Sequence, residues 1–226
     1  SLCWAAGIAA QQADFGDFLA HDPTDVVNSR LVILWGRNPA HTNVHLLPLL
    51  ARARAAGAAL VAIDPVRTDS TRMCDIHVAP APGSDWALAL AMGHVILAEG
   101  LLDREYVQDN VSGLEGYEAL VARWTPEAAS RVTGVPAGQI SELARSYARR
   151  RPACILMGYG LQRYVPGATT VRAVDALAAI TGNVGVAGGG ANYGNSFVSR
   201  SFGDLAARSP GLPSRGFVRA RTARGI

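Results

Sequence analysis

The sequence predicts an α/β domain built on a Rossmann-like, mostly parallel sheet with flanking helices. Short apolar runs alternate with longer segments of helical periodicity, and this alternation is typical of βαβ units. Hydrophobic residues make up 49% of the 226 residues and charged residues only 17%, a composition that supports a packed core. Glycine, proline or aspartate follows the apolar runs, so the strands are expected to end abruptly in loops.

Four apolar runs are predicted as buried strands. A continuous apolar run, without alternating polar residues, is typical of a parallel strand that is covered on both faces. Turn-forming residues bound each run, which limits its length to that of a strand. The predicted strands are 31–35, 59–63, 76–79 and 153–157.

Helices are predicted from capping signals together with apolar spacing. The segment 42–56 is expected to become helical near Leu47, because Pro48 suits a first helical turn. A long helix is expected to open at Ser84 or Asp85 and to stop at Gly100. Further helices are predicted at about 103–108, at 115–123, from Thr125, from Pro136 to about Arg150, and at 168–180.

Composition argues against several classes of protein. No run of about 18 apolar residues is present, so no membrane span is expected. Three scattered cysteines without a Cys-x-x-Cys pair indicate neither a disulfide framework nor an iron–sulfur or zinc cluster in this stretch. The net charge is +3, and the arginines near the end lack interleaved aromatic residues, so no nucleic-acid partner is expected.

The loops after the first two predicted strands carry candidate ligand-binding residues. Gly36 would let a ligand approach closely, and Asn38 offers both a donor and an acceptor. Asp64 could accept from the N–H groups of a guanine edge or from a ribose diol. Tight turns explain all three residues equally well. The Gly-x-Gly-x-x-Gly fingerprint is missing after the first strand, which argues against an ordinary NAD or FAD site.

The loops after the third and fourth predicted strands add further candidates. Gly83 and Asp85 open the long helix, whose free N–H groups could bind an anion, although capping alone would also explain them. Gly158 and Gly160 would let backbone amides reach a phosphate or a pterin, and Gln162 could bond an amide edge. A glycine-rich turn is the alternative. Ligands of open α/β sheets bind outside the carboxyl ends of strands, so the four loops together indicate a large nucleotide-like ligand.

Most histidines and cysteines are interpreted as structural. His41 and His45 are four residues apart, but no acidic third ligand is suitably placed, so a surface pair is favoured over a metal site. The remaining members of this group are expected in or near the core, or in apolar settings: His77, His94, Cys74 and Cys154.

Six short motifs follow one another along the chain. They are Trp35-Gly36-Arg37-Asn38-Pro39, Ile63-Asp64-Pro65, Cys74-Asp75-Ile76-His77, Pro82-Gly83-Ser84-Asp85, Gly158-Tyr159-Gly160-Leu161-Gln162 and Thr181-Gly182-Asn183-Val184-Gly185. Each motif is weak alone, but six in register are specific together. They stand in the order found in the dimethyl sulfoxide reductase family, which the sequence resembles over about residues 1–192. That family includes formate dehydrogenases, nitrate reductases and thiosulfate or polysulfide reductases.

The resemblance implies a fragment of a larger, prokaryotic, multidomain molybdenum or tungsten oxidoreductase that is inactive by itself. The implied cofactor is a pair of molybdopterin guanine dinucleotides on one metal atom, of which residues 1–192 would hold one. Residues 193–226 would begin a neighbouring domain or form a poorly ordered tail. By match, the cofactor-binding positions would be Gly36, Asn38, Asp64, Gly83, Asp85, Gly158, Gly160 and Gln162.

The resemblance also places Cys3 near the position of the family's protein ligand to the metal, where it would be the catalytic thiolate. A thiolate is a suitable soft ligand, and a small apolar cysteine beside Trp4 is the alternative. One departure concerns the second strand end, where Val66 stands at the arginine position of many relatives and Arg67 follows one residue later.

The implied partners are a small-molecule substrate and an electron-transfer iron–sulfur subunit, with a 4Fe–4S cluster expected in a preceding N-terminal part. The cytoplasm is slightly preferred over the periplasm. The alternative is a non-catalytic iron–sulfur-subunit relative of the same fold that has lost the cofactor.

Overall fold

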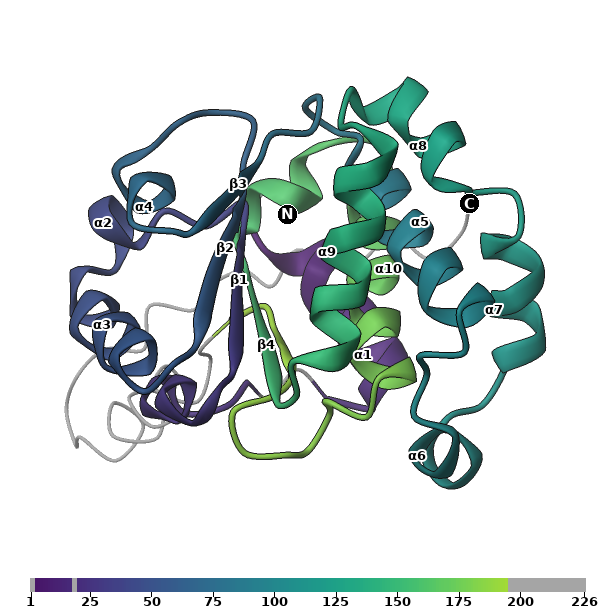
Figure 1. Ribbon diagram of the computed structural model, residues 1–226, viewed down its shortest axis with the longest axis horizontal. Helices are drawn as coiled ribbons and strands as arrows, with labels where there is room; N and C mark the ends of the chain where they lie inside the picture. Colours follow the sequence, from purple (N-terminus) through teal and green to yellow (C-terminus); the bar gives the residue numbers. More distant parts are fainter. Residues whose placement is uncertain (1–2, 18–19, 195–226) are drawn as a thin grey trace, which may run out of the picture.

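The computed structural model describes residues 3–17 and 20–194. Its centre is a five-stranded sheet in the order β3-β2-β1-β4-β5, in which all four pairings are parallel (Figure 1). The predicted α/β class and the four predicted strands are confirmed, whereas the two-residue β5 was not predicted. The strands are β1 (Leu31–Trp35), β2 (Ala59–Ile63), β3 (Ile76–Val78), β4 (Ala153–Met157) and β5 (Ala191–Asn192).

The central strand β1 shows why the apolar runs are continuous. Leu31, Ile33 and Trp35 pack into the larger hydrophobic cluster on one face of the sheet. Val32 and Leu34 pack into a smaller cluster on the other face. Successive side chains of a strand point to opposite faces, so a sheet that is covered on both sides requires apolar residues at every position.

Helices cover both faces of the sheet, in layers of unequal thickness (Figure 1). The thinner layer contains α2 (Pro39–Thr42), α3 (Leu47–Ala55) and α4 (Asp69–Arg72), with the 3-10 helices η1 (Pro23–Asn28) and η2 (Val44–Leu46). The thicker layer contains α1 (Ala5–Phe15), α5 (Asp85–Ala98), α6 (Arg104–Asn110), α7 (Leu114–Val121), α8 (Pro126–Thr133), α9 (Ala137–Arg149), η3 (Tyr159–Arg163) and α10 (Gly167–Ile180).

Helix α5 lies at the centre of the thicker layer and confirms the prediction of a long helix from Ser84 or Asp85. It packs against α7, α8, α9 and α10. Most of its residues are buried, around its whole circumference. A helix that is apolar on every side belongs inside a protein, so α5 is a core element around which the other helices are arranged.

Helix α1 was not predicted, and its sequence explains why. It is rich in alanine, and Trp4 at its start provides no side-chain capping bond. It ends at Gly16, which has the left-handed conformation of a helix end. Gly7 lets the helix pack closely, because a Cβ atom there would lie 2.1 Å from Cζ of Tyr193.

No helix in residues 3–17 and 20–194 is both long and apolar enough to cross a membrane. The predicted boundary near residue 192 stays a prediction. From residue 195 onward, the predicted tail lies outside the described residues.

Candidate functional site

The carboxyl ends of four strands lie level with one another. The amide of Gly36 donates to the carbonyl of Ile63 at 2.7 Å, and the amide of Gly158 donates to the carbonyl of Trp35 at 2.8 Å. The amide of Asp64 donates to the carbonyl of Val78 at 3.0 Å. The strand order reverses between β1 and β4, and this switch point is where open α/β sheets bind ligands. The loops that begin at Gly36, Asp64, Ala79 and Gly158 are called the strand-end loops below.

Gly36 and Gly158 meet at the switch point. A Cβ atom on Gly158 would lie 1.8 Å from the carbonyl oxygen of Gly36, and Gly36 itself has φ of +59°. Contact between two loops therefore explains both glycines without a ligand. Gly160 differs, because no atom lies within 4 Å of a Cβ placed there. Of the two glycines that begin the loop after β4, Gly158 is crowded and Gly160 has open space that a ligand could use.

Gly83 lies where the loop after β3 contacts the loop after β4. It has φ of +81°, and a Cβ atom there would lie 2.9 Å from Cδ1 of Tyr164. Both the left-handed backbone and the aromatic ring require glycine. The start of α5 is thereby fixed next to the segment that follows η3.

Asp85 is a buried carboxylate at the start of α5. Its side chain is 7% exposed, and Oδ1 accepts a hydrogen bond from Nε1 of Trp35 at 2.8 Å. Burial raises the pKa of Asp85, the bond from Trp35 opposes that rise, and the charge of Asp64 adds to it. Two carboxyl groups from different loops therefore lie within electrostatic range of each other at this edge.

Asp64 makes the turn that its sequence predicts. Its Oδ1 accepts from the amide of Val66 at 2.9 Å, and its backbone carbonyl accepts from Nε2 of His77 at 2.7 Å. The residue is half-buried. The hydrogen bond from Val66 therefore occupies one oxygen of the Asp64 carboxylate and fixes the orientation of the group.

Asn38 is held by the loop between β2 and β3. Its Oδ1 accepts from Oγ of Ser70 at 2.6 Å, and Oγ of Ser70 accepts in turn from the amide of Ala40 at 3.0 Å. Since the oxygen end of the amide is engaged, the nitrogen end is the donor that Asn38 could offer a ligand.

Gln162 does not join the other predicted residues. It is 7% exposed, and its Oε1 accepts from the amide of Gly7 at 3.0 Å and from the hydroxyl of Tyr193 at 3.0 Å. The side chain therefore fastens α1 to η3. The structure brings Asn38, Asp64 and Asp85 to one edge of the sheet, whereas Gln162 is directed into the helix layer.

Arg37 is a further candidate residue that the sequence argument did not single out. Its Nη1 donates to the carbonyl of Met157 at 3.4 Å, and burial lowers the pKa of this half-buried guanidinium. It brings a positive charge to the switch point. The available signal was its place between Gly36 and Asn38, two positions already considered as ligand-binding.

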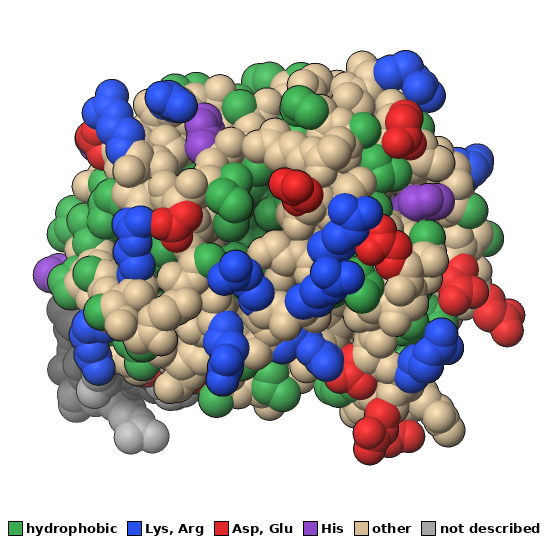
Figure 2. Space-filling view, viewed as in Figure 1, with side chains coloured by type: hydrophobic (Ala, Val, Ile, Leu, Met, Phe, Trp, Pro, Cys, Tyr) green, Lys and Arg blue, Asp and Glu red, His purple; other side chains and the backbone are tan. Residues whose placement is uncertain are grey.

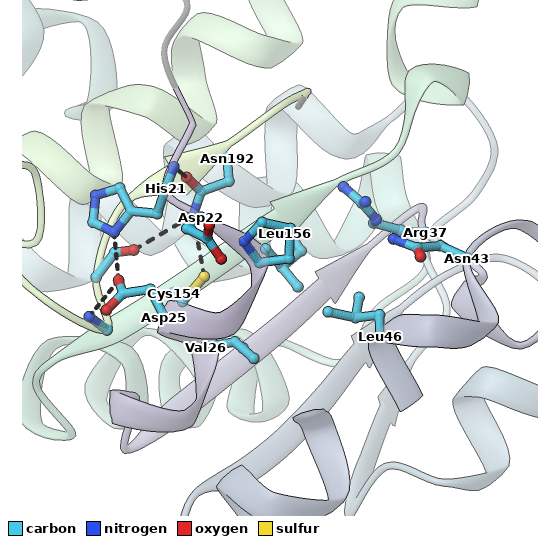
Figure 3. A pocket seen from close by; sticks show the side chains of 13 residues that line it. His21, Asp22, Asp25, Val26, Arg37, Asn43, Leu46, Cys154, Leu156 and Asn192 are labelled. Carbon is cyan, nitrogen blue, oxygen red and sulfur yellow. Dashed lines mark hydrogen bonds and ion pairs between the residues drawn. The ribbon is translucent and has the colours of Figure 1, made fainter. Parts of the chain in front are cut away.

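A small cavity lies beside Arg37 on the thinner-layer side of the sheet (Figure 3). Its volume is about 20 Å³, which is room for about one water molecule. Asn43 and Leu46 line it near Arg37, and His21 and Cys154 line it farther along. It is too small for a nucleotide.

Cys3 is exposed and precedes α1. The ring of neighbouring Trp4 packs on Tyr159 with centroids 6.0 Å apart. Burial raises the pKa of Tyr159, and Cys3 makes a minor addition to that rise. Tyr159 directly follows Gly158, so Cys3 lies near the strand-end loops. Within residues 3–17 and 20–194, no group of three or more histidine, cysteine or acidic side chains could hold a metal ion.

Four histidines lie where the sequence predicts, two on the surface and two near the core. His41 and His45 are both exposed, and Nε2 of His41 lies 2.9 Å from Oδ2 of Asp69. His77 and His94 are half-buried and bonded to backbone carbonyls.

Cys74 and Cys154 are likewise structural. Burial raises the pKa of Cys74 to about 11 and that of Cys154 to about 12, so both remain thiols at neutral pH.

The fold and the strand-end loops define the chain as a doubly wound α/β domain with polar side chains at its switch point. The model of the molybdopterin oxidoreductase family matches residues 4–222, and the chain belongs to that family.

Similar proteins include several oxidoreductases. The chain is 37% identical over 202 residues to the probable oxidoreductase YyaE of Bacillus subtilis, covering 89% of this chain and 30% of that protein. It is 38% identical over 168 residues to formate dehydrogenase H of Escherichia coli, covering 74% and 24%. Among solved structures, acetylene hydratase from Pelobacter acetylenicus superposes with a TM-score of 0.76 at 28% identity, covering 82% and 25%. The chain thus spans between a quarter and a third of the length of these relatives.

Proposed function

We propose that the strand-end loops bind the guanosine diphosphate end of a molybdopterin guanine dinucleotide, within a larger oxidoreductase. The observation that carries this proposal is the convergence of Asp64 and Asp85 at the carboxyl edge of the sheet, where the loop after β1 adds Arg37 and Asn38. One similar solved structure is named as a hydratase. The proposal of redox activity therefore rests on the relatives named as oxidoreductases and not on the fold.

The chemistry of these side chains fits such a ligand. A guanine edge presents N–H groups to neighbouring acceptors, and carboxylates such as Asp64 and Asp85 are acceptors only. Diphosphate oxygens are acceptors, which the guanidinium of Arg37 and the amide nitrogen of Asn38 complement. When bound, the metal–pterin unit would supply the redox chemistry, while this domain binds and orients the nucleotide end.

The open space at Gly160 is the second feature that supports the proposal. Its lack of neighbouring atoms, unlike the crowding at Gly158, leaves a place where a ligand could contact the backbone. Gly36, Gly83 and Gly158 would contribute indirectly, because they let the loops approach one another. Gln162 would act by holding α1 in place.

We further propose that Cys3 contributes a thiolate to the metal. Its exposure and its place beside Tyr159 support this role. In a full-length protein loaded with cofactor, Cys3→Ser should change the metal's absorption or magnetic spectrum. An unchanged spectrum would remove Cys3 from the metal site and leave the nucleotide proposal intact.

The proposal extends to the parent protein, in which we place a small-molecule substrate, a second guanine dinucleotide, a 4Fe–4S cluster and an iron–sulfur partner subunit. Nucleic acid is not among the proposed partners. The face shown in Figure 2 carries basic and acidic side chains across the same surface. A cytoplasmic location remains preferred over a periplasmic one.

Calorimetric titration of the chain with GDP and ADP tests the nucleotide proposal. GDP should bind more tightly than ADP, because adenine offers no matching pair of donors to the two carboxylates. Asp64→Asn should weaken GDP binding by about 10-fold while leaving ADP binding unchanged, the size expected for one charge-assisted hydrogen bond. Asp109→Asn, at an exposed helical position, is the matched control.

Equal binding of both nucleotides, or an unchanged GDP affinity in Asp64→Asn, would contradict the assignment of the guanine site. If no nucleotide binds at all, the alternative of a relative that has lost the cofactor would be favoured.

A further inference from the structure

Helices α1 and α10 face each other through two pairs of polar side chains. On α1, Gln11 and Asp14 are three residues apart, and on α10 Arg172 and Asp175 are three residues apart. Residues at this spacing share one face of a helix. Nε2 of Gln11 donates to Oδ1 of Asp175 at 2.9 Å, and Nε of Arg172 donates to Oδ1 of Asp14 at 2.7 Å.

The second oxygen of each carboxyl group lacks a donor. Oδ2 of Asp14 and Oδ2 of Asp175 are both buried and accept no hydrogen bond. Asp175 is only 1% exposed, and Asp14 lies within hydrogen-bonding range of it. Two ionised carboxylates are acceptors only and repel each other, so they could not be neighbours at this depth without compensation. One proton between them would satisfy both oxygens.

We propose that Asp175 and Asp14 share one proton, which Oδ2 of Asp175 donates to Oδ2 of Asp14, and that this bridge holds α1 on α10. The assignment of donor and acceptor follows from the surroundings. Asp175 is the deeper group, and its other oxygen faces only the neutral amide of Gln11. Oδ1 of Asp14 already accepts from the cationic guanidinium of Arg172, so Asp14 is assigned as the acceptor.

The neighbouring groups support a bound proton. Burial raises the pKa of Asp175 well above its usual range, and the charge of Asp14 adds to the rise. The bond from Gln11 and the charge of Arg172 oppose it. From α9, burial raises the pKa of Tyr147, and the charge of Asp175 is a minor addition to that rise.

A cleft gives this pair access to solvent. Its volume is about 750 Å³, and α1, α5, α6, α7 and α10 line it, with Tyr106 and Tyr117 among the lining residues. Asp14 and Asp175 also line it. A proton can therefore leave when the pH rises, although both Oδ2 atoms are buried.

The bridge matters because α1 leads to the strand-end loops. Gln11 also donates to the carbonyl of Ala191 at 2.8 Å, and Gly7 is bonded to Gln162. Trp4 and Cys3 precede these residues. Below the raised pKa of Asp175 the bridge is intact, and above it two negative charges face each other. We expect α1 to loosen as pH rises through that pKa.

Asp175→Asn provides a sharp test. Its Nδ2 can donate to Oδ2 of Asp14 while its Oδ1 still accepts from Gln11, so it mimics the bridge without a titrating proton. Hydrogen exchange of α1 amides, referenced to α9 amides at each pH, should show that wild-type α1 loses protection by about 10-fold or more as pH rises. Asp175→Asn should keep its protection throughout, and Asp175→Ala should lack it at every pH.

Infrared spectroscopy of the wild type supplies an independent measurement. The carbonyl band of a protonated carboxyl group should persist above the pH at which exposed carboxyls have ionised, and Asp175→Asn should lack that band. Absence of the band in the wild type, or equal loss of α1 protection in Asp175→Asn and Asp175→Ala, would overturn the proposal. No nucleotide enters either measurement, so the outcome is independent of the proposed function.

Discussion

Asp85 and Asp175 are both buried carboxyl groups whose pKa is raised by burial, yet their surroundings differ. Asp85 has an indole donor in Trp35, and its acidic neighbour Asp64 lies on a loop at the edge of the sheet. Asp175 faces Asp14 between two helices, and neither Oδ2 atom has a donor. The comparison teaches that a buried carboxylate can be kept as an acceptor for a ligand when the fold provides a donor. Where the fold provides no donor, as between Asp14 and Asp175, a proton bound to one carboxyl group takes the place of the donor.

The largest effect is expected where the strand-end loops touch. Gly158→Ala places a Cβ atom 1.8 Å from the carbonyl oxygen of Gly36. This clash involves the backbone, which cannot move away as a flexible side chain could. We expect a loss of about 3 kcal/mol or more in the free energy of unfolding, measured by urea denaturation.

Gly160→Ala is the matched control, two residues away in open space. It should change stability by less than about 0.5 kcal/mol, while weakening GDP binding if the ligand contacts this backbone. Equal destabilisation by the two substitutions would show that the loops are not packed as described.

Removal of the donor to Asp85 is expected to have the next largest effect. Trp35→Phe leaves Oδ1 of Asp85 buried without a partner, which together with the lost volume should cost about 2 kcal/mol at neutral pH. The deficit should shrink at acid pH. The hydrogen bond from Trp35 lowers the pKa of Asp85, so the variant has a higher folded-state pKa at this residue than the wild type. The variant therefore loses stability as the pH rises through that pKa and Asp85 ionises without a donor.

The control for this prediction is the double variant Trp35→Phe with Asp85→Asn, compared with each single variant. If unfolding measured at several pH values shows the same deficit throughout, the indole does not compensate the charge of Asp85.

A smaller effect is expected at the close approach of α1. Gly7→Ala brings a Cβ atom 2.1 Å from the Tyr193 ring, a side chain that can move, so we expect a loss of about 1–2 kcal/mol. Gly138→Ala, in helix α9 with open space around it, should instead stabilise the protein by about 0.5 kcal/mol. Thermal unfolding would distinguish the two, and a neutral Gly7→Ala would mean that α1 packs less closely than described.

The strands and most of the helices could be predicted because local patterns encode them. Continuous apolar runs identify buried parallel strands, and Gly57, Gly100 and Pro136 mark the boundaries of helices. Asp64 could be singled out because it directly follows a buried strand, and Asp85 because it opens the long helix after the third strand.

The partners of side chains could not be predicted, because they come from distant parts of the chain. Gln162 was expected to bind the ligand, but its Oε1 accepts from Gly7, which stands 155 positions earlier in an unpredicted helix. The contact between Gln11 and Asp175 spans 164 positions. Gly158 was predicted to bind the ligand. Its close contact with the carbonyl oxygen of Gly36, which requires a glycine, depends on the path of the loop after β1 and could not be predicted.

The most direct test of the central claim is a map of backbone amide shifts of the chain by nuclear magnetic resonance during titration with GDP. We predict that amides following β1, β2 and β4 shift, among them those of Asn38, Asp64 and Gly160, while amides of the α1–α10 interface stay unchanged. ADP should produce smaller shifts. Shifts concentrated on α1 and α10, or identical responses to GDP and ADP, would contradict a guanine-binding edge at the switch point of the sheet.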